Sequence, residues 1–195
     1  MNPTMPITRR VIRDNSAVVS QHLSAQYPLS AAQLFDYLTS PEHLKNWLGK
    51  VNRDEFIYEI ENNAQGRIES CKDHSFLITW ELDGVVSFLN VEITEISEGV
   101  AQLAAGFSTD AKDIKEHSDE KYGSGATGVG WDLSLLSLRR YVSGVAEEPS
   151  QQEYAAFVAD SAHAWGEADQ ASGVDPETTR KQSENTRRFY LGTEE

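Results

Sequence analysis

The chain has 195 residues, of which 39% are hydrophobic, and its formal net charge is −14. This length fits one domain with a substantial core and an extension. The charge argues against a nucleic-acid partner, whose backbone demands clustered Lys and Arg, and against an anionic membrane surface.

The single cysteine, Cys71, argues against a disulfide framework or a Cys-rich zinc site. It suits a reducing compartment, so we expect a cytoplasmic protein. The first residues contain arginines without a following apolar run, so we expect no signal peptide. No apolar stretch approaches the ~20 residues of a membrane span.

Residues 1–16 are predicted to be a polar lead-in. Strict alternation then begins and predicts a half-buried strand that Pro28 ends. The side chains expected on its inward face are Ala17, Val19, Gln21, Leu23, Ala25 and Tyr27. Gln21 is the one amide among them, and because buried amides need partners, we expect it to bond either the core or a ligand.

Two short helices are predicted next. Ser30 and Gln33 form a capping box, and Leu29 with Leu34 forms the matching hydrophobic staple. Ser40 and Pro41 are typical of the start of the second helix, and Gly49 of its end. The pair presents a largely apolar underside, consisting of Phe35, Leu38, Leu44, Trp47 and Leu48.

A series of strands follows, predicted at 54–61, 67–72, 75–82, 85–96 and 100–107. Asp83-Gly84 lies between two of these runs and is a strong hairpin signal. Strands this close in sequence pair antiparallel, because parallel crossovers need intervening helices. Residues 108–125 are polar and mostly acidic, and we interpret them as a solvated loop, with a mobile lid as the alternative.

The stretch 122–144 predicts the central element of the fold. Its four glycines are expected to break the approach to a long helix. This helix is apolar on two faces, so it must be covered on both. One face carries Trp131, Leu135, Leu138, Val142 and Val145, and the other carries Val129, Leu133 and Leu136.

Two more helices are predicted after residue 146. Ser150 and Glu153 form a second capping box, while Asp175 and Pro176 begin the final helix. The first of these helices is expected to cover the second face of the central helix. The expected organisation is therefore a lead-in over 1–16, a domain over 17–145 and a helical extension packed on it over 146–195.

We find no catalytic motif in the sequence. The five histidines have no metal-ligand spacing, and we expect neither a metal nor a cofactor. The glycine-rich stretch GSGATGVG lacks the Lys-Ser/Thr ending of a phosphate-binding loop. Glycines at a loop-to-helix junction serve tight turns and close backbone packing instead.

Several stretches resemble the START-like SRPBCC superfamily: the first strand, SAAQLFDYLTSPEHLKNWLG, RIESCKDHSFLITWEL, NVEITEISEG and GVGWDLSLLSLRRYVSG. Within it, the chain is similar to bacterial relatives of the C-terminal domain of the activator of heat-shock-protein-90 ATPase. The resemblance covers residues 17–144 and implies an α+β helix-grip fold, an antiparallel sheet curved around the long helix. It also implies a cavity between them, with walls from Phe56, Tyr58, Trp80, Leu89, Phe107, Trp131, Leu135 and Leu138. Together with Gln21 of the first strand, these are the candidate residues of a ligand site.

Periodicity alone cannot separate a cavity from a filled core at these positions. The leading hypothesis is a non-enzymatic module that binds an apolar or amphipathic small molecule. The alternative is a protein-interaction or co-chaperone-like domain, in which case a homodimer is possible. A cyclase-type enzyme is the least supported of the three.

Overall fold

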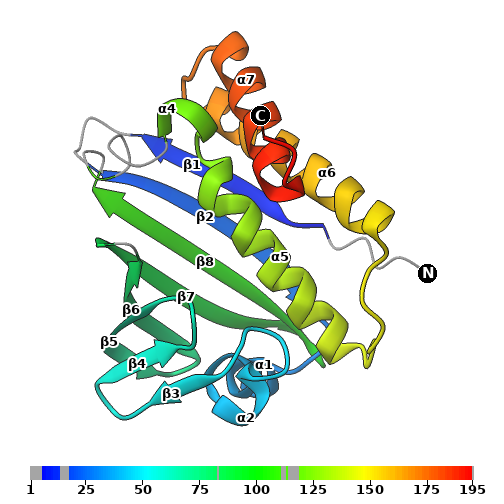
Figure 1. Cartoon of the computed structure of the whole chain (residues 1–195). Coiled ribbons are helices and arrows are strands. Elements are labelled where there is room, and N and C mark those ends of the chain that lie inside the picture. The colour runs from blue at the N-terminus through cyan, green and yellow to red at the C-terminus, as the bar shows by residue number, and fades with distance from the viewer. Residues whose placement is uncertain (1–5, 14–17, 83, 111–112, 114–118, 195) are drawn as a thin grey trace.

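The computed structural model describes residues 6–13, 18–82, 84–110, 113 and 119–194. Within them, a single eight-stranded antiparallel sheet has the order β1-β2-β8-β7-β6-β5-β4-β3 (Figure 1). The strands are β1 (Thr8–Arg13), β2 (Val18–Tyr27), β3 (Val51–Arg53), β4 (Ile57–Ile60), β5 (Gln65–Lys72), β6 (Ser75–Leu82), β7 (Val85–Ser97) and β8 (Val100–Asp110).

The expectation of a polar lead-in over 1–16 is wrong for residues 8–13, which form strand β1. Residues 8–13 pair with β2 along their whole length, from Thr8↔Ser24 to Arg13↔Val19. Residues 1–5 and 14–16 of the expected lead-in lie outside the described residues. The segment reads as polar because Arg9 and Arg13 share a face with the buried Val11, where each meets a buried carboxylate.

The alternation of β2 places its expected inward residues as predicted. Val19, Leu23, Ala25 and Tyr27 are buried, whereas Gln21 is half-buried; Ala17 lies outside the described residues. In β7, Ser87, Leu89, Val91 and Ile93 are buried and the residues between them are exposed. Because successive side chains of a strand point to opposite faces, β2 and β7 each direct every second residue to the core.

The expected chain of antiparallel hairpins is confirmed from β5 to β8. Strands β6 and β7 pair up to Leu82↔Val85 on either side of the predicted Asp83-Gly84 turn, of which Asp83 lies outside the described residues. Strands β7 and β8 pair up to Ser97↔Val100. β8 extends to Asp110, three residues further than predicted, and so takes in the start of the expected acidic loop.

Helices α1 (Ala31–Thr39) and α2 (Pro41–Leu44) cover one end of the sheet (Figure 1). The predicted capping box is present, since Ser30 accepts from the Gln33 N–H while the Gln33 side chain accepts from Ser30 N–H. α2 is shorter than expected: the helix ends at Leu44, and turns carry the chain to Gly49, whose φ is +134°.

Helix α5 (Gly125–Val142) crosses the sheet diagonally, preceded by the short α4 (Asp119–Tyr122) (Figure 1). The expectation that glycines break its approach is wrong for three of the four, since Gly125, Gly128 and Gly130 lie inside the helix. The helix needs them for packing: a Cβ on Gly128 would approach Trp165 Cε2 to 2.4 Å. Close contact with the next helix therefore outweighs the low helix propensity of glycine.

Helices α6 (Gln151–Ala171) and α7 (Pro176–Leu191) lie beside α5 on the β1 side of the sheet (Figure 1). The Ser150–Glu153 capping box is present, and Asp175 caps α7 as expected. On the second face of α5, Val129 is fully buried, while Leu133 and Leu136 are half-buried.

Candidate functional site

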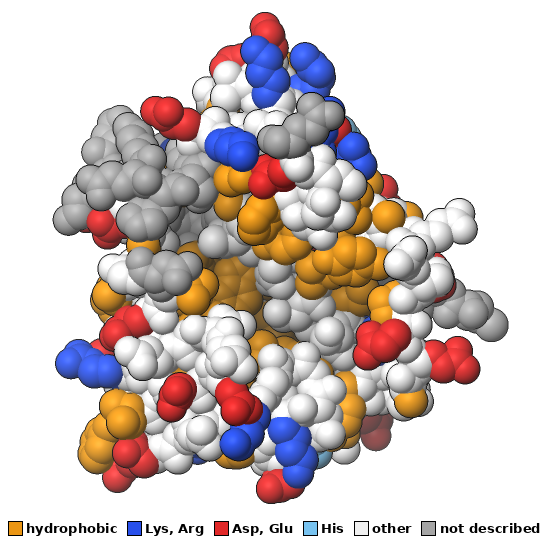
Figure 2. Space-filling model, viewed as in Figure 1, with side chains coloured by type: hydrophobic (Ala, Val, Ile, Leu, Met, Phe, Trp, Pro, Cys, Tyr) orange, Lys and Arg blue, Asp and Glu red, His pale blue; other side chains and the backbone are white. Residues whose placement is uncertain are grey.

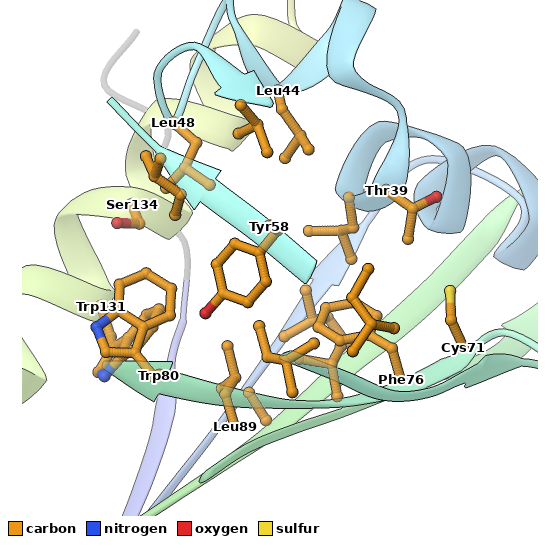
Figure 3. Close-up of a pocket in the computed structure, with 18 of the residues that line it drawn as sticks. Thr39, Leu44, Leu48, Tyr58, Cys71, Phe76, Trp80, Leu89, Trp131 and Ser134 are labelled. Carbon is orange, nitrogen blue, oxygen red and sulfur yellow. The ribbon is translucent and has the colours of Figure 1, made fainter. Parts of the chain in front are cut away.

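A cavity of about 130 Å³ lies between α5, the strands opposite it and the α1–α2 pair. Figure 3 shows its lining side chains converging from these elements. The space-filling view shows a hollow near the middle of one face of the molecule, with hydrophobic side chains on its floor (Figure 2). The lining includes Leu38, Leu44, Trp47, Leu48, Tyr58, Ile60, Ile68, Phe76, Ile78, Trp80, Leu89, Val91, Leu103, Ala105, Trp131, Ser134 and Leu135.

Elementary periodicity places most of these side chains. Phe76, Ile78 and Trp80 are every second residue of β6, and Leu103 and Ala105 follow the same rule on β8. Residues three and four apart share a helix face, which brings Trp131, Ser134 and Leu135 of α5 to the cavity together.

Aromatic rings form one end of the wall. The Trp80 and Trp131 rings lie 4.8 Å apart at 65° to each other, an edge-to-face contact. Phe107 packs against Trp131 at 5.3 Å, and Tyr58 lies 6.4 Å from Trp80. Such tilted pairs are the arrangement that ring quadrupoles favour, so the rings at this end of the wall stabilise one another.

The hydroxyls of the wall are already engaged with the main chain. Tyr58 Oη donates to the Thr79 carbonyl at 2.7 Å, and Ser134 Oγ donates to the Gly130 carbonyl at 3.0 Å. Burial, reinforced by the nearby Glu81 charge, raises the pKa of Tyr58. Arg53 is the one charged side chain among the lining residues, and it is exposed. The interior is therefore apolar, with charge confined to an exposed position.

Five of the nine residues predicted for the site line this cavity: Tyr58, Trp80, Leu89, Trp131 and Leu135. The other four lie elsewhere. Phe107 supports Trp131 from outside the lining, and Leu138 is fully buried among core side chains.

Gln21 faces inward but serves the start of α5. Its Nε2 donates to the Ser124 carbonyl at 3.0 Å, and its Oε1 accepts from Thr127 Oγ1 at 2.9 Å. Of the two expectations for this amide, bonding to the protein is the one realised.

Phe56 is a correction, because its side chain is 67% exposed. It has the same parity as Tyr58, but β4 begins only at Ile57. The Asp54 side chain accepts from the N–H groups of Phe56 and Ile57, which makes a turn of this segment. Strand alternation counted across a turn does not predict which face of the sheet a side chain occupies.

The sequence also carried signals for residues that the prediction left out. Phe76 and Ile78 share the alternation of Trp80, and Leu44, Trp47 and Leu48 belong to the apolar underside of the helix pair. Ala105 is inward on β8 by the same count. Among the described residues, no group of three or more His, Cys, Asp or Glu side chains could hold a metal.

These elements define the class of fold: an antiparallel sheet grips a long helix, and further helices follow it, which is an α+β helix-grip arrangement. The crystal structure of CalU16 from Micromonospora echinospora aligns with a TM-score of 0.67 and 17% identity, over 85% of this chain and 99% of that one. The solution structure of CalU16 aligns with a TM-score of 0.62 and 16% identity, over 99% and 97%.

A conserved protein of unknown function from Enterococcus faecalis, EF2215, aligns with a TM-score of 0.59 and 11% identity, over 96% of this chain and 93% of that one. At these identities the likeness shows the fold, and it confirms the predicted helix-grip architecture. No protein-family model matches the sequence, and no curated protein matches it. No helix in the described part of the chain is long and apolar enough to span a membrane.

Proposed function

We propose that the protein binds a small, neutral, largely apolar molecule in the cavity between α5 and the sheet, without chemically changing it. The observation that carries this proposal is the cavity itself, a space of about 130 Å³ with an aromatic and aliphatic wall. Ligand pockets are concave and lined mostly by apolar and aromatic side chains, and this space has that character.

The volume sets the size of the ligand. An apolar cavity of about 150 Å³ is known to stay free of water and to admit benzene. A cavity of about 130 Å³ therefore suits one aromatic ring with a short substituent. A larger amphipathic ligand would fit if α1 and α2 moved away from α5 and exposed more of the wall.

The chemistry of the wall favours binding over catalysis. Tyr58 and Ser134 direct their hydroxyl hydrogens to main-chain carbonyls, so neither is free to donate a proton to a ligand. The wall thus supplies apolar contact and ring edges, which recognise shape and hydrophobicity. The co-chaperone-like and homodimer alternatives stay predictions.

Ligand titration with a cavity-filling variant tests the proposal. Ethylbenzene should raise the melting temperature, because ligand at 100 times its dissociation constant adds ~2.7 kcal/mol to the folded state. Ala105→Leu places extra carbon atoms in the cavity and should abolish this shift. Ala104→Leu is the matched control, since Ala104 is the next residue of β8 and faces the other side of the sheet.

The expected result is a ligand-dependent shift in the wild type and in Ala104→Leu, and none in Ala105→Leu. Isothermal titration calorimetry should detect ethylbenzene binding to the wild type and to Ala104→Leu, and none to Ala105→Leu. Equal shifts in all three proteins would place ethylbenzene elsewhere, and no shift in the wild type would contradict the proposal.

A further inference from the structure

Helices α1 and α2 and the turns that follow them, residues 31–49, cover one side of the cavity, and we call this segment the flap. Figure 3 shows Thr39 and Leu44 of the flap on one side of the space, and Phe76 and Leu89 of the sheet on the other. The position of the flap therefore decides how far the cavity extends away from the sheet. The flap residues that line the cavity are Leu38, Thr39, Leu44, Trp47 and Leu48.

The hydrogen bonds between the flap and α5 all end on one atom, Tyr141 Oη, in the part of the chain that the structure describes. His43 Nδ1 lies 3.0 Å from this oxygen, and Asn46 Nδ2 donates to it at 3.2 Å. The other ring nitrogen, His43 Nε2, lies 3.1 Å from Asp36 Oδ2. Because a carboxylate only accepts, Nε2 carries a hydrogen, and Nδ1 of the neutral ring accepts from the Tyr141 hydroxyl.

Ring stacking and a separate anchor fix the rest of the flap. The Tyr37 and His43 rings are stacked, with centroids 4.2 Å apart at 8° to each other, and the Tyr37 and Tyr141 rings lie 5.5 Å apart. At the start of α1, the Ala31 N–H donates to the Glu95 side chain of β7 at 2.8 Å. The flap is thus bonded to the sheet at its first helix and to α5 through Tyr141.

A groove of about 640 Å³ lies between the flap, α5 and the start of α6. Trp47 and Leu48 line both this groove and the cavity, so these two side chains separate the two spaces. Leu133 and Leu136 of α5 give the groove apolar contact, and Ser137 gives it a hydroxyl. Its charged residues have both signs, so an ion of either sign would meet a like charge and a neutral polar group is favoured: Lys45, Arg140, Glu147 and Glu148.

We infer that Tyr141 sets the upper size limit of the ligand by holding the flap against α5. With the flap held, the ligand is confined to the cavity; with the flap released, the cavity joins the groove past Trp47 and Leu48. The released state admits an aromatic compound with an alkyl chain and a neutral polar end. This inference rests on the proposed function and adds a specificity-determining residue to it. Tyr141 does not line the cavity, so it acts through the flap.

The expected effect follows from an equilibrium between a held and a released flap. A ligand that needs the released flap has an apparent dissociation constant equal to its intrinsic constant divided by the released fraction. Tyr141→Phe removes the hydroxyl and keeps the ring. The value of one hydrogen bond corresponds to about threefold to tenfold in this fraction. A ligand that fits the closed cavity is unaffected as long as the held state predominates.

Two ligands of different length test the inference by calorimetry. Ethylbenzene fits the cavity, whereas 6-phenylhexan-1-ol adds a longer chain and a terminal hydroxyl. In the wild type, we expect 6-phenylhexan-1-ol to bind more weakly than ethylbenzene. Tyr141→Phe should tighten 6-phenylhexan-1-ol about threefold to tenfold and leave ethylbenzene nearly unchanged. If the lost hydroxyl contacted the ligand in the groove, its removal would weaken binding, so a gain identifies the flap.

Tyr37→Phe is the matched control. It removes a hydroxyl from the same ring cluster, but the Tyr37 hydroxyl bonds to none of the described residues. The ratio of the two affinities should therefore stay at its wild-type value. Asn46→Ala is the second test variant, because it removes the other hydrogen bond to Tyr141 Oη and should raise the same ratio. Amide hydrogen exchange over residues 37–48 should be faster in Tyr141→Phe than in Tyr37→Phe.

The outcomes separate this inference from the proposed function. An unchanged affinity ratio in Tyr141→Phe would overturn the inference, provided that ethylbenzene binds, and would leave the proposed function standing. Binding of 6-phenylhexan-1-ol to the wild type as tightly as ethylbenzene would do the same, because no size limit would then exist. Failure of ethylbenzene to bind the wild type would overturn both.

Discussion

Gly128 of α5 lies directly against the indole of Trp165 of α6, so closely that a Cβ at position 128 would come within 2.4 Å of Cε2 and 2.5 Å of Cδ2. Trp165 is fully buried. This contact sets the distance between the central helix and its outer cover. It also explains why glycines occur inside the helix that carries the cavity wall.

Gly128→Ala should therefore destabilise the protein, although alanine is the better helix former. We expect a loss of about 3 kcal/mol in the free energy of unfolding, at the upper end for overpacking, because the indole has no free space to move into. Gly130→Ala is the control: its Cβ would meet the Tyr190 hydroxyl at 3.0 Å, the far end of a side chain. Urea unfolding should show the first variant clearly less stable; equal stabilities would show that Trp165 can shift.

The same interface contains a buried carboxylate with a distinct pH dependence. Asp132 is fully buried, and its Oδ2 accepts from Arg9 Nε at 2.8 Å, from Ser161 and from Trp165. Burial raises the pKa of Asp132, and the Arg9 charge and these hydrogen bonds counter part of that rise.

A raised pKa means that the folded state holds this proton at a pH where the unfolded chain has lost it. The contribution of Asp132 to stability should therefore fall as pH rises from about 4, the usual aspartate pKa, through the raised value. Asp132→Asn removes that titration. As pH rises through this range, the unfolding free energy of the wild type should therefore fall relative to that of Asp132→Asn. Parallel profiles of unfolding free energy against pH for the two proteins would contradict a raised pKa of Asp132 in the folded state.

Removing the extension tests whether α6 and α7 cover α5. A chain ending at Val145 loses Trp165, which packs on Gly128, and Asp169, which accepts from Arg13 Nη2 at 2.9 Å. It also uncovers the fully buried Val129. Exposed apolar area costs ~25 cal/mol per Å², so we expect aggregation or a large drop in melting temperature.

A shorter truncation controls for the loss of the chain end itself. Deleting residues 194–195 keeps the Thr193 N–H bond to the Arg188 carbonyl at the end of α7 and removes only the exposed contacts of Glu194 with Lys121 and Tyr122. It should change the melting temperature little. An unchanged melting temperature in the longer truncation would show that the extension does not support the domain.

The cavity can also be tested through stability without any ligand. Ala105→Leu should stabilise the free protein by about 1 kcal/mol, as filling an empty space does. In a close-packed core the same change would cost ~1–3 kcal/mol through overpacking. Chemical unfolding of Ala105→Leu and Ala104→Leu measures whether each substitution raises or lowers the free energy of unfolding. A destabilised Ala105→Leu would mean that the space is already filled.

Local rules predicted the parts of the fold that local residues determine. The β2 alternation, the Ser30 and Ser150 capping boxes and the antiparallel pairing of β5 to β8 followed from neighbours in sequence. The wall residues Trp80 and Leu89 followed from the same alternation.

The failures share a different physical cause, a partner distant in sequence. Arg9 and Arg13 made β1 look like a polar tail, because the carboxylates that receive them are 123 and 156 residues away. Gly128 looked like a helix breaker until Trp165 was placed on it. Nor could hydrophobic periodicity show that the side chains around Trp131 leave a cavity between them, since volume depends on how three elements meet.

The most direct test of ligand binding in the cavity is X-ray diffraction at the bromine absorption edge from a crystal soaked with bromobenzene. Bromobenzene is close to the volume that a cavity of about 130 Å³ admits. If a ligand binds here, bromine should give an anomalous peak inside the space bounded by Trp80, Trp131 and Leu135, and Ala105→Leu crystals should lack it. A cavity without anomalous density, or a peak that persists in Ala105→Leu, would contradict ligand binding at this site.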